Sequence, residues 1–340
     1  MKLKISTVGT YLIIFTFSFV MQLVFVYQLL KNSKSAIYGT NDDAIISSIA
    51  SGQLTGKPDA HWVFIQPIMS VPLTWLQNFS NSYNIYILLL VILVAFSLSL
   101  ILTLTINLRD NNIFTNLLIL IFWITITFTI IGWFSLAPTY TGASLIITGA
   151  AVALIYGMLN DKNQRQVNAY ICAVLILLMV GYAIRKESIY IGILLLVPAL
   201  IFKFKESIKI LRCKYFGISI IIFFLFILSN FFLRESMYKN NQWNSFENTN
   251  NARHQVQLRS PERNLEKHLN EINWSKADYL LFTRFSLLDP SKMNQENMEN
   301  IVEVTKPDGN TSINEFTFSL FLKTAQHGFQ AWTWLAKLVL

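Results

Sequence analysis

The sequence predicts an all-α polytopic membrane protein with about seven to eight transmembrane helices and a small helical domain outside the membrane. Long apolar runs recur through the first part of the chain, and the residues after position 233 are mostly polar. Of the 340 residues, 53% are hydrophobic and only 14% are charged, whereas about a quarter of the residues of a soluble domain are charged. This balance indicates an integral membrane protein.

The apolar runs define a transmembrane domain over residues 1–233. A helix needs about 20 residues to cross the hydrocarbon core, and the run at 188–202, which contains Pro198, is short for that length. Residues 326–340 become apolar again, so a further span or an interfacial helix could begin there. The seven expected spans cover residues 8–30, 84–106, 113–134, 142–159, 167–184, 188–202 and 215–233.

The distribution of Lys and Arg predicts that the N-terminus is cytoplasmic. The first apolar run exceeds the roughly 15 residues of a signal-peptide core, so we expect it to be retained as a span. The basic segment 203–214 then falls in a cytoplasmic loop, as the positive-inside rule requires, and the outer segment 135–141 carries no basic residue.

Topology therefore accounts for the net charge of +8. No stretch interleaves many basic and aromatic side chains, so we expect no nucleic-acid partner. The abundance of Ile, Asn and Lys is typical of an AT-rich bacterial gene, and the expected location is a bacterial plasma membrane.

Two segments are expected on the outer side of the membrane. The loop 31–82 contains an aromatic stretch that is interrupted by prolines, which predicts a helix lying in the interface with Trp62 and Trp75 at headgroup depth. The region 234–325 is predicted to form a helical domain, in which Ser275 and Asp278 have the spacing of a capping box.

Two adjacent aspartates, Asp42 and Asp43, follow the first span in a part of the chain where charges are scarce. The predicted topology brings Arg185 and Glu187 to the same outer surface. A carboxylate there is a candidate general base for a hydroxyl, and the second carboxylate can bind a divalent cation, Mg²⁺ or Mn²⁺, through oxygen. The planar guanidinium suits a phosphate group. This combination favours sugar transfer from a lipid phosphate.

Three further residues are candidates for substrate binding at this surface. Asp59 and His61 lie in the first outer loop, and Tyr140 lies in the loop that precedes the fourth span. Simpler interpretations stay open, since Asp59 and His61 can be ordinary loop residues and Tyr140 can belong to the aromatic belt.

The principal candidates also have a structural alternative. Asp42 and Asp43 can cap a helix that begins near residue 44, because aspartate is a favoured capping residue and a negative charge suits the positive end of a helix. Arg185 and Glu187 can form an ion pair at the membrane edge.

The layout resembles the GT-C class of glycosyltransferases. The stretch "NDDAIISSIASGQLTGKPDAHWVFIQPIMSVPLTWL" looks like the first outer loop of uncharacterised bacterial membrane proteins of that plan, and "RKESIYIGILLLVPAL" looks like their arginine–acid motif. "NNARHQVQLRS" and "WSKADYLLFTRFSLLD" look like motifs of their outer domain. The resemblance implies a GT-C-like fold, a lipid-linked sugar donor, and a first-loop aspartate, Asp42 or Asp43, that acts as base or metal ligand.

Two other functions stay open. A transporter or flippase of lipid-linked sugars would carry charged residues inside several spans, and the expected spans contain almost none. A non-catalytic assembly protein would bind its partner through the outer domain, and charge-neutral changes at the aspartates would then matter little.

Overall fold

The computed structural model describes most of the first 239 residues and short stretches after them. Within the described residues every regular element is a helix, and the chain divides into two compact units, Met1–Asn240 and Asn241–Leu340. Each unit is described by itself. The described residues are 7–32, 41–80, 84–107, 113–160, 164–239, 243–245, 247–249, 269–270, 273–283, 292, 294, 296–297 and 299–300.

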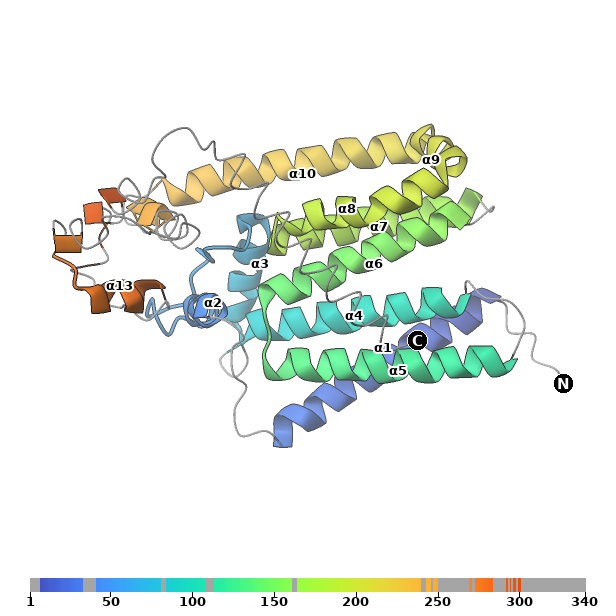
Figure 1. Cartoon of the computed structure of the whole chain (residues 1–340), viewed down its shortest axis with the longest axis horizontal. Coiled ribbons are helices and arrows are strands. Elements are labelled where there is room, and N and C mark those ends of the chain that lie inside the picture. Colours follow the sequence, from blue (N-terminus) through green and yellow to red (C-terminus); the bar gives the residue numbers. More distant parts are fainter. Residues whose placement is uncertain are drawn as a thin grey trace. The chain divides into compact units, whose positions relative to one another are not determined.

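Long helices arranged side by side form most of the first unit (Figure 1). Two short helices, α2 and α3, lie at one end of them, and the short helix α9 lies at the other (Figure 1). We call these the α2–α3 end and the α9 end. The helices are α1 (Thr7–Asn32), α2 (Asn41–Ser51), α3 (Pro67–Gln77), α4 (Ile85–Asn107), α5 (Ile113–Leu136), α6 (Tyr140–Asn160), α7 (Gln164–Ile184), α8 (Ser188–Phe202), α9 (Phe204–Leu211) and α10 (Lys214–Tyr238).

The composition of α4 shows why these segments are membrane helices. Its 23 residues include no charged side chain, and at 1.5 Å per residue they extend about 34 Å, enough for a hydrocarbon core of roughly 30 Å. The hydroxyl of Thr103 donates to the carbonyl of Ser99 at 2.8 Å. A hydroxyl within the apolar helix is therefore satisfied by the helix itself, as the absence of water in the bilayer requires.

Five described helices are long and apolar enough to cross a membrane, which confirms the prediction of a multi-pass helical membrane protein. The bent pair α8 and α9 adds a sixth if it is one broken span, and the described part of α5 adds a shorter apolar helix. The full number of spans stays a prediction, and residues 326–340 lie outside the described part of the chain. The five helices span Leu12–Lys31, Ile85–Thr105, Tyr140–Leu159, Val167–Ile184 and Lys214–Tyr238.

Helices α4 and α6 pack against each other in the middle of the first unit. Helices α1 and α5 pack on α4, α7 and α8 pack on α6, and α10 packs on α7. Between α1 and α4 the contact is partly polar, since the buried Gln22 amide donates to the hydroxyl of Ser99 at 2.7 Å. Such pairs hold helices together in lipid, where hydrophobic burial between helices contributes little.

The short sixth apolar run ends in a sharp bend. Helix α8 has 15 residues and continues through Pro198, and the chain then turns by 114° at Lys203 into α9. The break in the run therefore lies beyond Pro198, at the junction of α8 and α9.

The loop between α1 and α4 is the one predicted to lie on the outer side, and we keep the name first outer loop for it. Its aromatic stretch folds back against the helix bundle. Trp75 on α3 is 61% exposed, but Trp62 is fully buried. The Trp62 ring packs edge-to-face on Tyr86 of α4 at 5.6 Å between centroids. The Trp62 ring therefore fills the core between the loop and α4 and is not an exposed belt aromatic, and its expected position at headgroup depth stays a prediction.

The second unit contains the helix α13 (Lys276–Thr283). Its predicted capping box is confirmed: the Asp278 carboxylate accepts from the backbone N–H of Ser275 at 2.8 Å, and the Ser275 hydroxyl accepts from the backbone N–H of Asp278 at 3.1 Å. Lys292 forms an ion pair with Asp278 at 2.7 Å, and this pair ties α13 to the segment that follows it.

Candidate functional site

Asp42 and Asp43 lie in the first turn of α2. The Asp43 side chain is fully buried, and its Oδ1 accepts two hydrogen bonds. The hydroxyl of Tyr86 on α4 donates one at 2.6 Å, and the backbone N–H of Tyr140, the first residue of α6, donates the other at 2.8 Å. One carboxylate therefore joins three helices.

Asp43 caps the N-terminal end of α6. The first N–H groups of a helix have no intrahelical partner, and Asp43 accepts from that of Tyr140 while Thr139 Oγ1 accepts from that of Gly142 at 3.0 Å. A negative charge is favourable there because the N-terminal end of a helix is positive. The structure shows Asp43 capping α6. Helix α2 begins at Asn41, so both aspartates lie in its first turn, and their role as caps of α2 stays a prediction.

Arg185 reaches the same end of α6 from the end of α7. Its guanidinium donates a hydrogen bond to the hydroxyl of Thr141 and lies over the Tyr140 ring, 5.3 Å from the centroid. Its Nε is 3.5 Å from Oε2 of Glu187. The Tyr140 ring also stacks on Phe64, with 5.6 Å between centroids and 5° between planes. Tyr140 is therefore the point at which the first outer loop, α6 and the α7–α8 turn meet.

Small residues set the position of the Arg185 backbone. The Ser144 hydroxyl of α6 donates to the Gly181 carbonyl of α7 at 2.8 Å, and the Ser188 hydroxyl donates to the Arg185 carbonyl at 2.8 Å. Thr148 of α6 donates to the Ser188 hydroxyl at 3.1 Å. Close packing of hydroxyl-bearing and glycine residues is typical of helix interfaces in membranes, and here it fixes the turn that carries the guanidinium.

The exposure of the side chains increases across the cluster, from fully buried Asp43 to accessible Glu187. Asp43 is fully buried and Tyr140 is 6% exposed, whereas the side chains of Arg185 and Glu187 are 33% and 50% exposed. Asp42 is half-buried and interacts electrostatically with Tyr140, as Asp43 and Arg185 also do. The structure thus brings together the aspartate pair, Tyr140 and the arginine–glutamate pair that the sequence singled out.

Asp59 and His61 have contacts of a different kind. The Asp59 carboxylate accepts from the backbone N–H of His61 at 2.9 Å and contacts Nδ1 of its ring at 2.5 Å, and the Asp59 carbonyl accepts from Trp62 Nε1 and Thr74 Oγ1. His61 Nε2 lies 3.1 Å from the carbonyl oxygen of Met237 on α10. These contacts attach the loop to α3 and α10. The binding role expected for Asp59 and His61 stays a prediction.

Three residues of this cluster were not found by sequence reasoning. Tyr86 and Phe64 lie within apolar stretches, where an aromatic residue is most simply part of the core. Thr141 is one of many hydroxyl residues in the apolar helices. No local signal marks any of them, because their roles depend on partners at sequence separations of 43 and 44 residues for Tyr86 and Thr141.

The described side chains of the cluster give little support for a metal site. Among the described residues no three imidazole, thiolate or carboxylate groups gather closely enough to hold a metal ion. Asp43 Oδ1 already accepts two hydrogen bonds, so this oxygen is poorly suited to join the oxygen-rich shell that Mg²⁺ or Mn²⁺ requires. The cation expected at Asp42 and Asp43 stays a prediction, and no step below depends on one.

The fold and the cluster define a class: a multi-pass helical membrane protein with an acidic and arginine-containing cluster at one end of its helices. Comparisons with protein-family models, with curated proteins and with solved structures found no match. The cluster's chemistry is therefore the basis for a functional proposal.

Proposed function

We propose that this protein is a membrane glycosyltransferase that moves a sugar from a polyprenyl-phosphate carrier to a cell-surface glycan, lipid or protein. The observation that supports this most is the meeting of a guanidinium with two carboxylates around Tyr140. Arg185 lies over the Tyr140 ring and Asp43 accepts from its backbone N–H. The cluster lies at the α2–α3 end of an apolar helix bundle (Figure 1), where a donor held in the bilayer can arrive laterally.

Asp42 is the general base in this proposal. Asp43 is fully buried and its Oδ1 accepts from Tyr86 and Tyr140, so it is committed to holding three helices together. Asp42 is half-buried and is the member of the pair that an acceptor hydroxyl can approach. Asp43 is then a positioning residue, which fixes Tyr140 and the start of α6.

The transfer step balances without another reactant. The acceptor hydroxyl gives its proton to the Asp42 carboxylate while its oxygen forms a bond to the anomeric carbon of the sugar. The bond from that carbon to the phosphate oxygen breaks, and the electron pair leaves with the lipid phosphate. Arg185 stabilises the negative charge on the leaving phosphate with its guanidinium.

Glu187 orients the arginine in this proposal. Its carboxylate lies 3.5 Å from Arg185 Nε, while another nitrogen of the guanidinium donates to Thr141. With these two contacts the guanidinium plane is set by partners on both sides. Arg185→Lys keeps the charge but loses this planar arrangement, and we expect transfer to fall about tenfold to a hundredfold, in line with the loss of a charge-assisted hydrogen bond.

The test compares Asp42→Asn, Asp43→Asn and Arg185→Lys in membranes of cells in which the full chain is the only source of the activity. Incorporation of labelled sugar into the surface glycan is measured, and folded protein is quantified by monodisperse elution in detergent. Glu235→Gln is the matched control, since Glu235 is an exposed acid on α10. We expect Asp42→Asn to lose transfer while it keeps a normal amount of folded protein, and Asp43→Asn to lose both. Unchanged incorporation in both aspartate variants would reject the proposal.

The alternative function is transport of lipid-linked sugars, and an assay in vesicles distinguishes it from sugar transfer. Three of the described spans, Ile85–Thr105, Tyr140–Leu159 and Val167–Ile184, contain no charged residue, and a polar path through the membrane usually has some. In vesicles with labelled lipid carrier and no acceptor, the proposal predicts no lipid movement above that of empty vesicles. Movement that survives Asp42→Asn would favour transport instead.

A further inference from the structure

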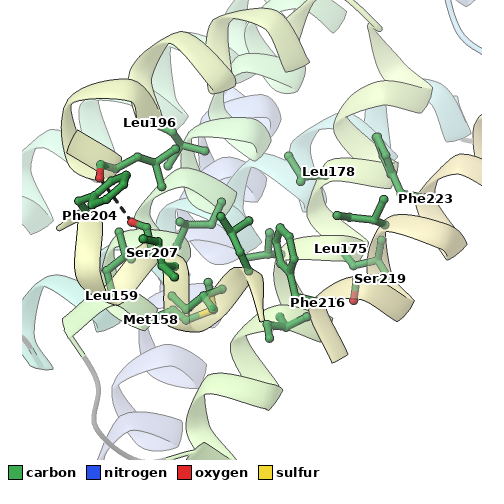
Figure 2. Close-up of a pocket in the computed structure, with 18 residues that line it drawn as sticks. Met158, Leu159, Leu175, Leu178, Leu196, Phe204, Ser207, Phe216, Ser219 and Phe223 are labelled. Atoms are coloured by element: carbon green, nitrogen blue, oxygen red, sulfur yellow. Dashed lines mark hydrogen bonds between the residues drawn. The ribbon is translucent and has the colours of Figure 1, made fainter. Parts of the chain in front are cut away.

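A second feature lies at the α9 end, away from the aspartate cluster. An apolar cavity of about 420 Å³ that is partly open is lined by residues of α6, α7, α8, α9 and α10 (Figure 2). Among the described residues, two serines are the only polar lining residues, and no lining residue is charged or is a tryptophan. The walls that Figure 2 labels include Leu175, Leu178, Leu196, Phe216 and Phe223.

Helix α9 forms the floor of this cavity with one face. Phe204, Ser207, Ile208 and Leu211 line it, and these positions recur with the spacing of one helix face. The Ser207 hydroxyl donates to the Lys203 carbonyl at 2.8 Å, so it is satisfied by the backbone. The cavity therefore offers a ligand an apolar surface.

The basic residues of α9 and its flanks do not line the cavity. Lys205, Lys209 and Arg212 are spaced four and three residues apart, along another face of the helix, and with Lys214 they are exposed to the surroundings. Within the described part of the chain no ion pair involves these four cations. Segment 203–214 contains five basic residues and a single acid, Glu206.

We propose that an anionic phospholipid of the leaflet at the α9 end binds here, with one acyl chain in the cavity and its phosphate on the basic face of α9. The volume lies within the roughly 300–1,000 Å³ of small-molecule sites. The surface of the protein beside the cavity is also apolar, since Ile201 is 66% and Phe202 is 86% exposed. A ligand from the bilayer meets a matching surface there, whereas a soluble ligand does not.

The headgroup decides which lipid binds. An acyl chain in the bilayer is already in an apolar medium, so its transfer into an apolar cavity is nearly neutral. A Lys or Arg near the membrane surface attracts an anionic lipid about fivefold more strongly than a neutral residue does. Selectivity should therefore follow lipid charge, and it should weaken as salt is added.

The test uses the full chain in nanodiscs of phosphatidylcholine. Phe216→Trp places a fluorophore in the cavity wall, and lipids with brominated acyl chains quench it on contact. The chain has eight other tryptophans, so quenching at the cavity is the difference between this variant and the protein without the substitution. We expect brominated phosphatidylglycerol to quench at a mole fraction at least tenfold below that of brominated phosphatidylcholine. Combining Lys205→Gln, Lys209→Gln and Arg212→Gln should remove most of the preference, because three cations at about fivefold each account for roughly a hundredfold.

The control removes the same charge elsewhere, through Lys31→Gln, Lys57→Gln and Lys239→Gln, all exposed residues. It should change the preference less than about twofold if local electrostatics decide binding. Equal quenching by the two lipids in the protein that carries only Phe216→Trp would overturn the proposal, and that comparison does not depend on the folding of the charge variants. Equal losses in test and control variants would also overturn it. A lipid-independent dimer with no quenching would assign the cavity to a second copy of the chain and equally refute a lipid site.

Discussion

Tyr86 of α4 donates a 2.6 Å hydrogen bond to Asp43 of α2, and both side chains are fully buried. The pair links the first outer loop to the helix bundle. Because the same Asp43 oxygen accepts from the backbone N–H of Tyr140, the position of the first outer loop and that of α6 depend on one another.

The first prediction concerns the stability of this pair. Tyr86→Phe keeps the ring that packs on Trp62 but removes the donor, and leaves a buried carboxylate with one partner fewer. We expect a loss of about 1–3 kcal/mol in the free energy of unfolding, the typical penalty for a buried polar group that loses a partner. Unfolding in detergent, followed by circular dichroism, measures it. Tyr190→Phe is the control, because Tyr190 is 70% exposed, and an equal loss there would contradict this explanation.

The second prediction concerns the contact between α6 and α7. A Cβ atom added at Gly181 would lie 2.7 Å from Thr148 Oγ1, which is too close for a van der Waals contact. We expect Gly181→Ala to destabilise the protein by about 1–3 kcal/mol through overpacking. Gly149→Ala on α6 should not destabilise it, since an added Cβ there meets no atom within 4 Å.

A double-mutant cycle tests the cause of that effect. Thr148→Ala removes the hydroxyl that Gly181→Ala would strike, so the double variant should be more stable than the sum of the single effects predicts. Purely additive effects would show that Thr148 is not the obstacle.

The third prediction concerns the attachment of α10. Asn230, buried on α10, donates to Gln66 Oε1 at 2.7 Å and accepts from the backbone N–H of Ile68 at 3.3 Å. Asn230→Leu is similar in size but leaves both partners unsatisfied. We expect the Ile68 amide to exchange with deuterium at least about fivefold faster, because a buried polar group without a partner costs about 1–3 kcal/mol. Ser229→Ala, at the exposed neighbouring position, should leave that exchange rate unchanged, and unaltered exchange in Asn230→Leu would refute the role of the contact.

The fourth prediction is a pH dependence in the second unit. The hydrogen bond from Lys292, together with those from Ser275, lowers the pKa of Asp278 from 3.8 to about 2. Since the pKa is lower in the folded state, the carboxylate stabilises α13 above about pH 4, and this contribution is lost as the pH falls towards 2.

Hydrogen exchange of residues 276–283, compared between the protein and Asp278→Asn, measures this effect. The difference in protection should be constant above pH 4 and should vanish near pH 2. A difference that persists at pH 2 would mean that the carboxylate is not responsible.

Local patterns in the sequence were sufficient for the helical, multi-pass architecture. Runs such as that of α4 leave no alternative in a bilayer, because every backbone polar group must be satisfied within the segment. The capping box of Ser275 and Asp278 was equally readable, since its partners lie three residues apart. The position of the break at Lys203 could not be predicted in this way, because no local pattern marks it and the helix continues through the nearby Pro198.

The sequence by itself determined that acids and an arginine would lie at the same end of the helices, since segments that connect successive spans can lie only at one of the two ends. Only the tertiary structure decided that Asp43 is buried as a cap of α6, that Asp42 is the more accessible of the two, and that Tyr86 and Phe64 belong to the cluster. The physical reason is range: hydropathy and capping act over a few neighbouring residues, whereas the partner of a buried carboxylate is chosen by the packing of helices that are distant in the chain.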